Sequence, residues 1–508
     1  MISVIPDIAR NGAEKFTDLP ALADSRRVFS YQALWERVEM GAKQLGGGGT
    51  IALYASPGPD WVVALFAALA AGRCVFPVSH KESSEFLQTS FVHAGVEQVI
   101  CSSTLCDKSP VHKTVEIETL GLNKYSGTLP EISPDYRALI SFTSGSTQEP
   151  KAVLLSHNNI VANIRGLIEV QQVTSDDVFL SVLPPSHLFE LVVGNLAPMV
   201  LGASIHFTAT PLPNRILQAL RKQGITYLLL VPALLEMLAS ELIDILIDDH
   251  ILPDELRGLS LEVIAESSLT QSADIVSAIR NIIGPGLHSI VVGGAALDPR
   301  WQQVLSALGI ELYLGYGMTE ASPILTCSKA TDCPSGSVGK ALPNIELRLN
   351  DRSEILASGP NIMQGYIGKP ARLESWFNTG DIGRIDEAGN VFIEGRSKEA
   401  MVSANGETIF PDEMEAYYQH LDFIDSCVIP LSGNDGNDKP TLVIYSHLDH
   451  AEVKKIINEM AGNAPERLRT RNYILSGHPL PRTELGKIQR RKLAAMFREQ
   501  SNEKRNDA

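Results

Sequence analysis

A loop that is rich in hydroxyl groups and ends in a lysine occupies residues 141–151, with the sequence SFTSGSTQEPK. Backbone N–H groups and hydroxyls in such a loop can surround phosphate oxygens, while Lys151 supplies a mobile positive charge. The spacing is not that of a Walker A loop, which requires G-x-x-x-x-G-K-[ST]. The loop therefore predicts phosphate binding, and an ordinary surface turn is the alternative. The predicted phosphate-binding residues are Thr143, Ser144, Gly145, Ser146, Thr147 and Lys151.

Four later segments combine small residues with an aromatic ring or with charged groups. These are VGGAAL at 292–297, LGYGMTE at 314–320, NTGDIG at 378–383 and LPRTELGKI at 480–488. Small residues allow a ligand to approach the backbone closely, a flat ring can cover a base, and a carboxylate suits a hard cation. Taken singly, each segment can also be a strand-end turn or a solvated surface loop.

Taken together and in this order, the segments resemble those of the adenylate-forming superfamily, which includes acyl-CoA synthetases, luciferases and nonribosomal peptide adenylation domains. FTSGSTQEPKAVLLSHNNI resembles the phosphate-binding loop of that superfamily. The resemblance covers nearly the whole chain and implies ATP-dependent activation of a carboxylic acid as an acyl-AMP. Gln148 and Ala152 are departures, because the family usually has glycine at the first position and often at the second. Gln148 places a side chain where glycine permits positive φ, so we expect a stiffer or differently shaped loop.

The resemblance assigns the adenine, phosphate and metal contacts to specific residues. Thr319 would contact the α-phosphate, and Glu320 would help to hold Mg²⁺. The adenine site would be formed by the ring of Tyr316 and the strand end at Gly293, Gly294 and Ala295.

The same resemblance distributes the remaining roles between the ribose, the acid and a moving domain. Asp381 would bind both ribose hydroxyls, and Arg396 would add a ribose or phosphate contact. His187, within PPSHLFE, would line or gate the acyl pocket. Lys487 would reach the acid carboxylate and the α-phosphate, and Lys398 lies at the family's hinge position. Because attack of a carboxylate on the α-phosphorus brings two anions together, the reaction needs the positive charge of Mg²⁺ and Lys487.

The order of predicted elements indicates an α/β protein. Strands are expected at 49–55, 98–102, 138–142, 178–183, 204–207, 227–231 and 290–292, with helices at 61–71 and 158–170. This alternation predicts βαβ units and mainly parallel sheets. Shorter β-like pieces from about residue 346 indicate a small β-rich module, and a second alternation follows residue 396. We therefore predict an N-terminal adenylation domain over 1–396 and a small, mobile α+β domain over 397–508, whose rotation would separate the two half-reactions.

The acid and the acceptor thiol are predicted less directly. Segments 178–207 and 227–246 are strongly apolar and resemble fatty acyl-CoA synthetases more than amino-acid-activating domains. An apolar pocket gains roughly 0.8 kcal/mol per buried CH₂, which favours a medium- or long-chain fatty acid, although an aryl acid would also fit. MVSANGETIFP, which follows the hinge, resembles the loop lining the pantetheine tunnel, so CoA is the expected acceptor.

Two alternatives remain open. The phosphopantetheine of a holo-acyl carrier protein uses the same tunnel as CoA, and an acidic carrier would need a basic patch. Such a patch could be formed by Arg467, Arg469, Arg471, Arg490, Arg491 and Lys492. The other alternative is a nucleotide-binding regulatory protein that has lost catalysis, against which the presence of Lys487 argues.

Composition limits the class of protein further. The chain has 508 residues, of which 44% are apolar and 20% charged, as expected for a globular protein of more than one domain. Its net charge of -16 disfavours nucleic acid as a partner. Six scattered cysteines favour reduced thiols in the cytoplasm. The most apolar stretches, 61–77 and 227–246, contain charges, and no signal peptide is recognised, so we expect no transmembrane segment and leave peripheral membrane contact open.

Overall fold

The fold is seen in a computed structural model that describes most of the chain. The described residues are 2–143, 151–208, 210–257, 272–370, 372, 374–402, 408–418, 423–432, 438–483 and 486–506. The chain forms two compact units. The N-terminal unit comprises Met1–Thr143, Pro150–Glu346 and Ala357–Phe377, and the C-terminal unit includes Leu347–Leu356 and Asn378–Ala508. The domain boundary predicted between residues 396 and 397 is the hinge of a proposed rotation of the small domain, and it stays a prediction.

The first sheet of the N-terminal unit has seven strands in the order β17-β8-β7-β4-β3-β5-β6. The strands are β3 (Thr50–Tyr54), β4 (Cys74–Val78), β5 (Val96–Cys101), β6 (Thr114–Glu116), β7 (Arg137–Phe142), β8 (Ala152–Ser156) and β17 (Gly365–Tyr366). Strands β7, β4, β3, β5 and β6 pair in parallel, whereas β8 pairs antiparallel with both β7 and β17. Parallel neighbours need a crossover, which α3 (Pro59–Ala70) and α4 (Ser84–Ala94) provide.

The second sheet has eight strands in the order β14-β13-β12-β11-β9-β10-β1-β2. The strands are β1 (Pro20–Ala23), β2 (Val28–Ser30), β9 (Val178–Ser181), β10 (Ser204–Phe207), β11 (Tyr227–Leu230), β12 (Ser289–Val292), β13 (Glu311–Gly317) and β14 (Ile324–Lys329). The pairings are parallel from β13 to β1, and the two edge pairings, β13–β14 and β1–β2, are antiparallel. The predicted α/β class with mainly parallel sheets is confirmed.

Helices surround these two sheets. They are α1 (Asp7–Lys15), α2 (Tyr31–Leu45), α5 (His157–Val170), α6 (Ala197–Val200), α7 (Pro213–Lys222), α8 (Pro232–Asp248), α10 (Ala273–Ile283) and α11 (Arg300–Ala307). Helix α3 is apolar around nearly its whole circumference, and all but one of its residues are buried. A helix of this kind belongs to the core of a large domain. Only Ala71, Gly72 and Arg73 separate this helix from β4, so the two elements form nearly one apolar stretch, and β4 was not predicted as a separate strand.

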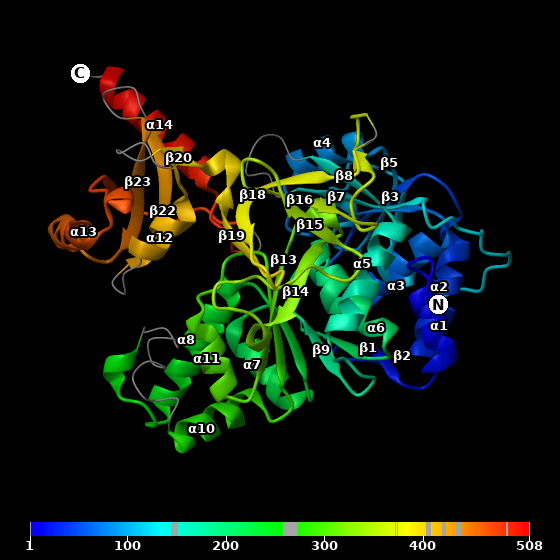
Figure 1. Cartoon of the computed structure of the whole chain (residues 1–508). Helices are drawn as coiled ribbons and strands as arrows, with labels where there is room; N and C mark the ends of the chain where they lie inside the picture. The colour runs from blue at the N-terminus through cyan, green and yellow to red at the C-terminus, as the bar shows by residue number, and fades with distance from the viewer. Residues whose placement is uncertain are drawn as a thin grey trace. The chain divides into compact units, whose positions relative to one another are not determined.

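The C-terminal unit begins with the predicted small β-rich module, which is confirmed as a four-stranded sheet in the order β15-β16-β18-β19. Its strands are β15 (Glu346–Leu349), β16 (Glu354–Ser358), β18 (Phe377–Ile385) and β19 (Val391–Arg396). The remainder contains β20 (Met401–Val402), β21 (Thr408–Ile409), α12 (Pro411–Tyr418), β22 (Phe423–Ser432), β23 (Asp438–Ser446), α13 (His450–Asn463), β24 (Tyr473–Leu475) and α14 (Arg490–Asn506). Helices α12 and α14 both pack against β22 (Figure 1).

One expectation about the cysteines is wrong. Cys101, at the end of β5, and Cys106 form a disulfide, with their Cα atoms 5.3 Å apart. The chain turns back immediately after β5, and this turn brings together two thiols that are close in sequence. Cys74, Cys327, Cys333 and Cys427 lie outside this disulfide and are thiols, as predicted.

The sequence predicts no transmembrane segment. Among the described residues, every helix is either too short or too polar to cross a bilayer. The predicted cytoplasmic location stays a prediction.

Candidate active site

In the N-terminal unit, a tyrosine that was not predicted, Tyr366, contacts two predicted site residues, Lys151 and Glu320. Lys151, at the start of β8, places its Nζ 5.0 Å from the centre of the Tyr366 ring. The Tyr366 hydroxyl donates a hydrogen bond of 2.8 Å to Oε1 of Glu320. The antiparallel pairing of β8 with β17 sets Val153 opposite Tyr366, which holds the lysine beside this ring. A candidate phosphate-binding cation and a candidate metal ligand therefore both contact one tyrosine.

The Glu320 carboxylate is buried, with only 7% of the residue exposed. Burial and the neighbouring Glu320 carboxylate raise the pKa of Tyr366, so its hydroxyl remains a donor at neutral pH. Among the described residues, no cluster of three or more His, Cys, Asp or Glu side chains could hold a metal without further ligands. Mg²⁺ commonly binds through one or two carboxylates together with substrate phosphates, and Glu320 fits that pattern.

Buried asparagines fix the turn that carries Thr319 and Glu320. This turn, η6 (Thr319–Ala321), follows β13. Asn163, on α5, donates to the carbonyl of Ile324 at 2.6 Å, and Asn361 donates to the carbonyl of Ala321 at 2.8 Å. Because a buried carbonyl without a donor costs about 1–3 kcal/mol, these amides specify the turn strongly.

Another asparagine of α5 holds the segment that leads to Tyr366. Asn159 donates to the carbonyls of Pro360 and Ile362, at 2.7 and 2.9 Å. Its own position is set by a capping box, in which Ser156 and Asn159 bond each other's backbone N–H groups at the start of α5. Helix α5 therefore orders both chain segments that bring Glu320 and Tyr366 together.

The predicted adenine site lies at the carboxyl ends of two parallel strands. Tyr316 is on β13 and half-buried, while Gly293 and Gly294 follow β12. A Cβ atom at Gly293 would lie 2.9 Å from the ring of Phe189, and Gly294 has a φ of +86°. A side chain at Gly293 would displace the Phe189 ring, and the positive φ of Gly294 favours glycine there. Ala295 is exposed beside them. Ligands of open α/β sheets bind at this edge.

His187 precedes a π-helix, η3 (Phe189–Leu196), and its backbone N–H donates to the carbonyl of Pro184 at 3.0 Å. The next ionisable residue, Glu190, is completely buried. Its Oε1 accepts hydrogen bonds from Ser181 Oγ at 2.5 Å and from Asn195 Nδ2 at 3.2 Å. Burial raises the pKa of Glu190 to about 8, against the effect of these donors. A buried carboxyl group with a raised pKa therefore lies inside the segment predicted to form the acyl pocket.

In the C-terminal unit, a hairpin brings two predicted ribose-binding residues together. Strands β18 and β19 pair antiparallel, with Asp381 directly opposite Arg396. Arg396 Nε lies 3.2 Å from Asp381 Oδ1, and the aspartate is only 3% exposed. Asp381 is thus a buried carboxylate paired with an arginine of the same hairpin, and its contact with the ribose stays a prediction.

Lys487 is in a tight turn of the C-terminal unit. Its backbone N–H donates to Thr483 Oγ1 at 3.1 Å, and its carbonyl accepts from the Thr483 N–H at 2.8 Å. Arg482 donates to the carbonyl of Gly486 and, at 2.7 Å, to Asp425 Oδ1. The lysine keeps more than a third of its surface exposed. Even so, partial desolvation of the ammonium lowers its pKa, and repulsion from Arg396 lowers it further.

Lys398, the predicted hinge, is exposed in the short turn η8 (Ser397–Glu399). Five residues of the predicted phosphate-binding loop lie outside the described residues, namely Ser144, Gly145, Ser146, Thr147 and Gln148. Thr143 and Lys151 are described, and the Thr143 N–H donates to the Lys151 carbonyl at 3.0 Å. Sequence reasoning missed Tyr366, whose only signal was a Gly-Tyr pair after an apolar run, and Glu190, whose signal was a single charge within FELVVGNL.

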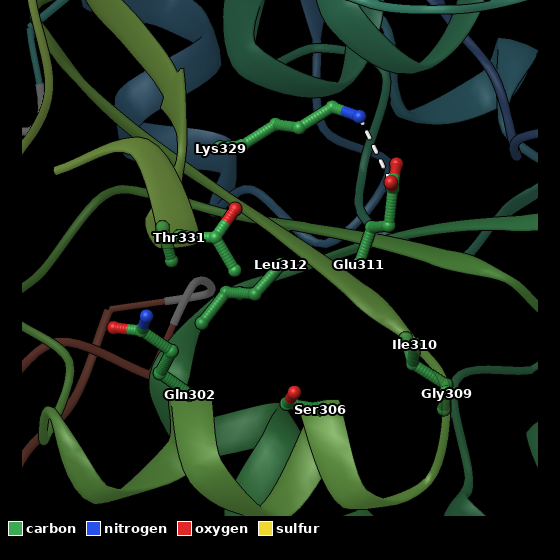
Figure 2. A pocket seen from close by; sticks show the side chains of 9 residues that line it. Gln302, Ser306, Gly309, Ile310, Glu311, Leu312, Lys329 and Thr331 are labelled. Carbon is green, nitrogen blue, oxygen red and sulfur yellow. Dashed lines mark hydrogen bonds and ion pairs between the residues drawn. The ribbon is translucent and has the colours of Figure 1, made fainter.

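A pocket of about 270 Å³ lies elsewhere in the N-terminal unit, between α11 and the start of β13 (Figure 2). Glu311 and Lys329 form an ion pair of 2.8 Å on its wall, and Thr331 also lines the pocket. The pocket is at the amino end of β13, whereas Tyr316 and Glu320 are at or beyond the carboxyl end of the strand. It therefore contains none of the predicted site residues.

Comparison with known proteins agrees with this fold. A model of the AMP-binding enzyme family matches residues 9–367. The chain is 26% identical over 502 residues to 4-coumarate–CoA ligase 2 of Oryza sativa subsp. japonica, covering 86% of this chain and 81% of that protein. It is 29% identical over 337 residues to long-chain-fatty-acid–CoA ligase 6 of Mus musculus, covering 59% of this chain and only 47% of that protein.

The fold also matches the solved structure of o-succinylbenzoate CoA synthetase (MenE) from Bacillus subtilis in complex with the acyl-adenylate OSB-AMP. The TM-score is 0.79 at 18% sequence identity, with 96% of this chain and 98% of that chain covered. The protein belongs to the AMP-binding enzyme family, and the predicted membership of the adenylate-forming superfamily is confirmed.

Proposed function

We propose that this protein is an ATP-dependent acid–thiol ligase that converts a carboxylic acid to an acyl-AMP and then transfers the acyl group to CoA. The observation that carries the proposal is the contact series Lys151, Tyr366 and Glu320, in which a cation lies against the ring of one tyrosine and a buried carboxylate accepts from its hydroxyl. Triphosphate recognition needs a cation for the phosphate oxygens and an oxygen ligand for the accompanying metal. The proposal is further supported by its family and by the acid–CoA ligases among its relatives.

In the first half-reaction, an oxygen of the acid would attack the α-phosphorus of ATP. A new C–O–P linkage forms, the bond from the α-phosphorus to the bridging oxygen breaks, and pyrophosphate leaves. Mg²⁺, held by Glu320 and the phosphates, would neutralise charge on the triphosphate. Thr319 would contact the α-phosphate, Asp381 would hold the ribose, and Lys487 would supply positive charge where the two anions meet.

In the second half-reaction, the thiol of CoA would attack the acyl carbonyl. A thioester bond forms, the thiol proton is released, and AMP leaves with the electrons of the broken acyl–oxygen bond. Rotation about Lys398 would remove the Lys487 turn from the path of the thiol. Because that turn is held by bonds within itself and to Asp425, it would move as a formed structure rather than refold.

For the acid, we propose a medium- or long-chain fatty acid. Support comes from the apolar η3 and α8 segments and from the similarity to a long-chain-fatty-acid–CoA ligase. The similarity to 4-coumarate–CoA ligase extends over more of the chain, which favours an aryl acid as the second candidate.

CoA is the preferred acceptor because the basic patch needed by an acidic carrier protein is partly neutralised. Arg467 donates to Glu413 at 3.0 Å, and Arg490 is surrounded by Glu399, Asp412 and Glu415. Two of the six residues in the predicted patch are therefore engaged by carboxylates of the same unit. This leaves less positive charge for a carrier than the sequence alone suggested.

The proposal is tested by ATP–pyrophosphate exchange with fatty, aryl and amino acids in parallel, followed by thioester formation with CoA or with a holo-acyl carrier protein. We expect exchange with fatty acids and transfer to CoA. Exchange restricted to aryl acids would change the substrate class, and transfer only to the carrier would change the acceptor. No exchange with any acid, despite nucleotide binding, would instead favour a catalytically silent regulatory protein.

A further inference from the structure

Four charged side chains form a compact cluster in the C-terminal unit, which we call the Arg490 cluster. Arg490 donates to both carboxylate oxygens of Glu415, from Nε at 3.1 Å and from Nη2 at 2.6 Å. Its Nη1 lies 3.1 Å from Glu399 Oε2, and Nη2 also contacts Asp412. Only 15% of the arginine side chain is exposed, so one guanidinium joins three carboxylates largely out of water.

The cluster is specific to arginine. A guanidinium presents several donors in a rigid plane and can satisfy Glu415 bidentately while reaching two further acceptors, which a lysine ammonium cannot do in the same geometry. Glu415 also accepts the Val428 N–H at 2.7 Å, so the cluster is tied to β22 as well. Burial raises the pKa of Glu415, and Arg490 opposes that shift. Removing the guanidinium would leave buried carboxylates without a counter-charge, which is costly.

The four residues of the Arg490 cluster come from three elements of the chain, η8, α12 and α14. Arg490 begins α14, three residues after Lys487, and Gln489 is joined to Pro481 by a backbone bond of 2.8 Å across the lysine turn. Glu399 directly follows Lys398 in the η8 turn, while Asp412 and Glu415 lie on α12. The guanidinium therefore links the lysine turn to the residue after the proposed hinge. On the other side of the same turn, Arg482 is bound to Asp425.

We propose that Arg490 is a positioning residue for adenylation, which holds the Lys487 turn and the η8 turn in one rigid body. A rotation about Lys398 then carries Lys487 to the acid and the α-phosphate with a fixed geometry. This inference rests on the proposed function, because it presumes that Lys487 acts in acyl-AMP formation. Misplacement of a reacting group by about 1 Å can lower a rate about 100-fold, so a clamp of this kind has a measurable effect.

The test compares Arg490→Lys, which keeps the charge, with Arg352→Lys, which alters an exposed arginine in the turn after β15. Each protein is assayed for ATP–pyrophosphate exchange and, separately, for thiolation of supplied acyl-AMP. We expect Arg490→Lys to lower the maximal exchange rate at least about tenfold, with the KM for ATP and the thiolation rate changed less than about twofold. Arg352→Lys should match the wild type in both assays.

Equal loss of both half-reactions would mean that Arg490 only stabilises the fold, and an unchanged exchange rate would overturn the proposal directly. If Arg490→Lys does not yield folded protein, Glu399→Ala removes the acceptor on the η8 turn and should show the same selective loss of exchange. Wild-type protein is measured alongside. Failure of the wild type to exchange with any acid would overturn the proposed function itself. If the wild type exchanges normally, the result for the variant tests the role of Arg490 alone.

Discussion

The hydroxyl of Tyr366 donates a 2.8 Å hydrogen bond to Oε1 of Glu320, across 46 positions of sequence. Glu320 is the candidate magnesium ligand, and the same tyrosine ring lies 5.0 Å from the Lys151 ammonium. A donor that binds one oxygen of a metal ligand fixes the orientation of the carboxylate and leaves the other oxygen for the metal. Tyr366 therefore makes two contacts that can be tested separately: its hydroxyl donates a hydrogen bond to Glu320, and its ring contacts the Lys151 ammonium.

Substitution Tyr366→Phe removes the hydroxyl and retains the ring. Loss of a hydrogen bond to a metal ligand commonly costs about 10–100-fold in metal affinity or activity. We therefore expect the Mg²⁺ concentration for half-maximal ATP–pyrophosphate exchange to rise about tenfold. Tyr366→Leu, which also removes the ring, should further weaken the response to ATP. An unchanged Mg²⁺ dependence in Tyr366→Phe would remove the tyrosine from the metal site.

Substitution Lys487→Ala should abolish acyl-AMP formation and leave thiolation of supplied acyl-AMP largely intact. The reason is that the ammonium opposes charge repulsion only where the carboxylate meets the α-phosphate. Both half-reactions are measured on the same preparation. If they fall together, Lys487 does not have the assigned role.

The pH dependence of adenylation provides a separate test of Lys487. Desolvation and Arg396 lower the pKa of this lysine, so it loses its proton at a lower pH than a free lysine does. Since the charged form is needed, the exchange rate should be full at neutral pH and fall on the alkaline side below the ordinary lysine pKa of about 10.4. In Arg396→Gln, this alkaline fall should move to higher pH. A fall that does not move would mean that another group controls it.

Substitution Asp381→Ala should weaken ATP binding, because it removes the carboxylate that would accept hydrogen bonds from the ribose hydroxyls. Hydrogen bonds to charged groups contribute about 1.5–3 kcal/mol, which corresponds to roughly a 10–100-fold rise in Kd. Nucleotide binding is measured by calorimetry, with Asp351→Ala, an exposed aspartate of the same unit, as the control. Unchanged affinity for ATP would exclude Asp381 from the ribose site.

Glu190 makes folding stability depend on pH. Its pKa is raised to about 8 in the folded chain, compared with about 4.3 for an unfolded glutamate. The folded state therefore holds the extra proton, so this contribution is full below about pH 4.3 and is lost as the pH rises to about 8. Glu190→Gln is neutral at every pH, so its stability relative to the wild type should increase from pH 5 to pH 8 by about 1 kcal/mol or more.

Thermal unfolding at the two pH values checks this expectation. Glu169→Gln, which alters an exposed glutamate at the end of α5, should show no such trend. A Glu190→Gln variant whose relative stability is the same at pH 5 and pH 8 would show that Glu190 is charged or solvated in the folded protein.

The sequence by itself determined the features that depend on local pattern and motif order. Alternating apolar runs predicted the strands at 178–183 and 204–207 and the helix at 158–170, which the structure has as β9, β10 and α5. The Asp381 and Arg396 pairing is also close to local, since it follows from a single hairpin. Motif types and their order identified the family, because the spacing of such residues along the chain is a property of the sequence alone.

Only the tertiary structure decided which partners these residues have. Tyr366 reaches Glu320, Asn163 reaches Ile324, and Arg490 reaches Glu399 across long stretches of chain, and no period or turn signal encodes such contacts. The environment of a charge is decided in the same way. Glu190 is one acidic residue in an apolar run until packing removes it from water, and Arg490 is one of several basic residues until three carboxylates enclose it. Burial and proximity arise from folding the whole chain, so the chemistry that depends on them cannot be derived from local sequence.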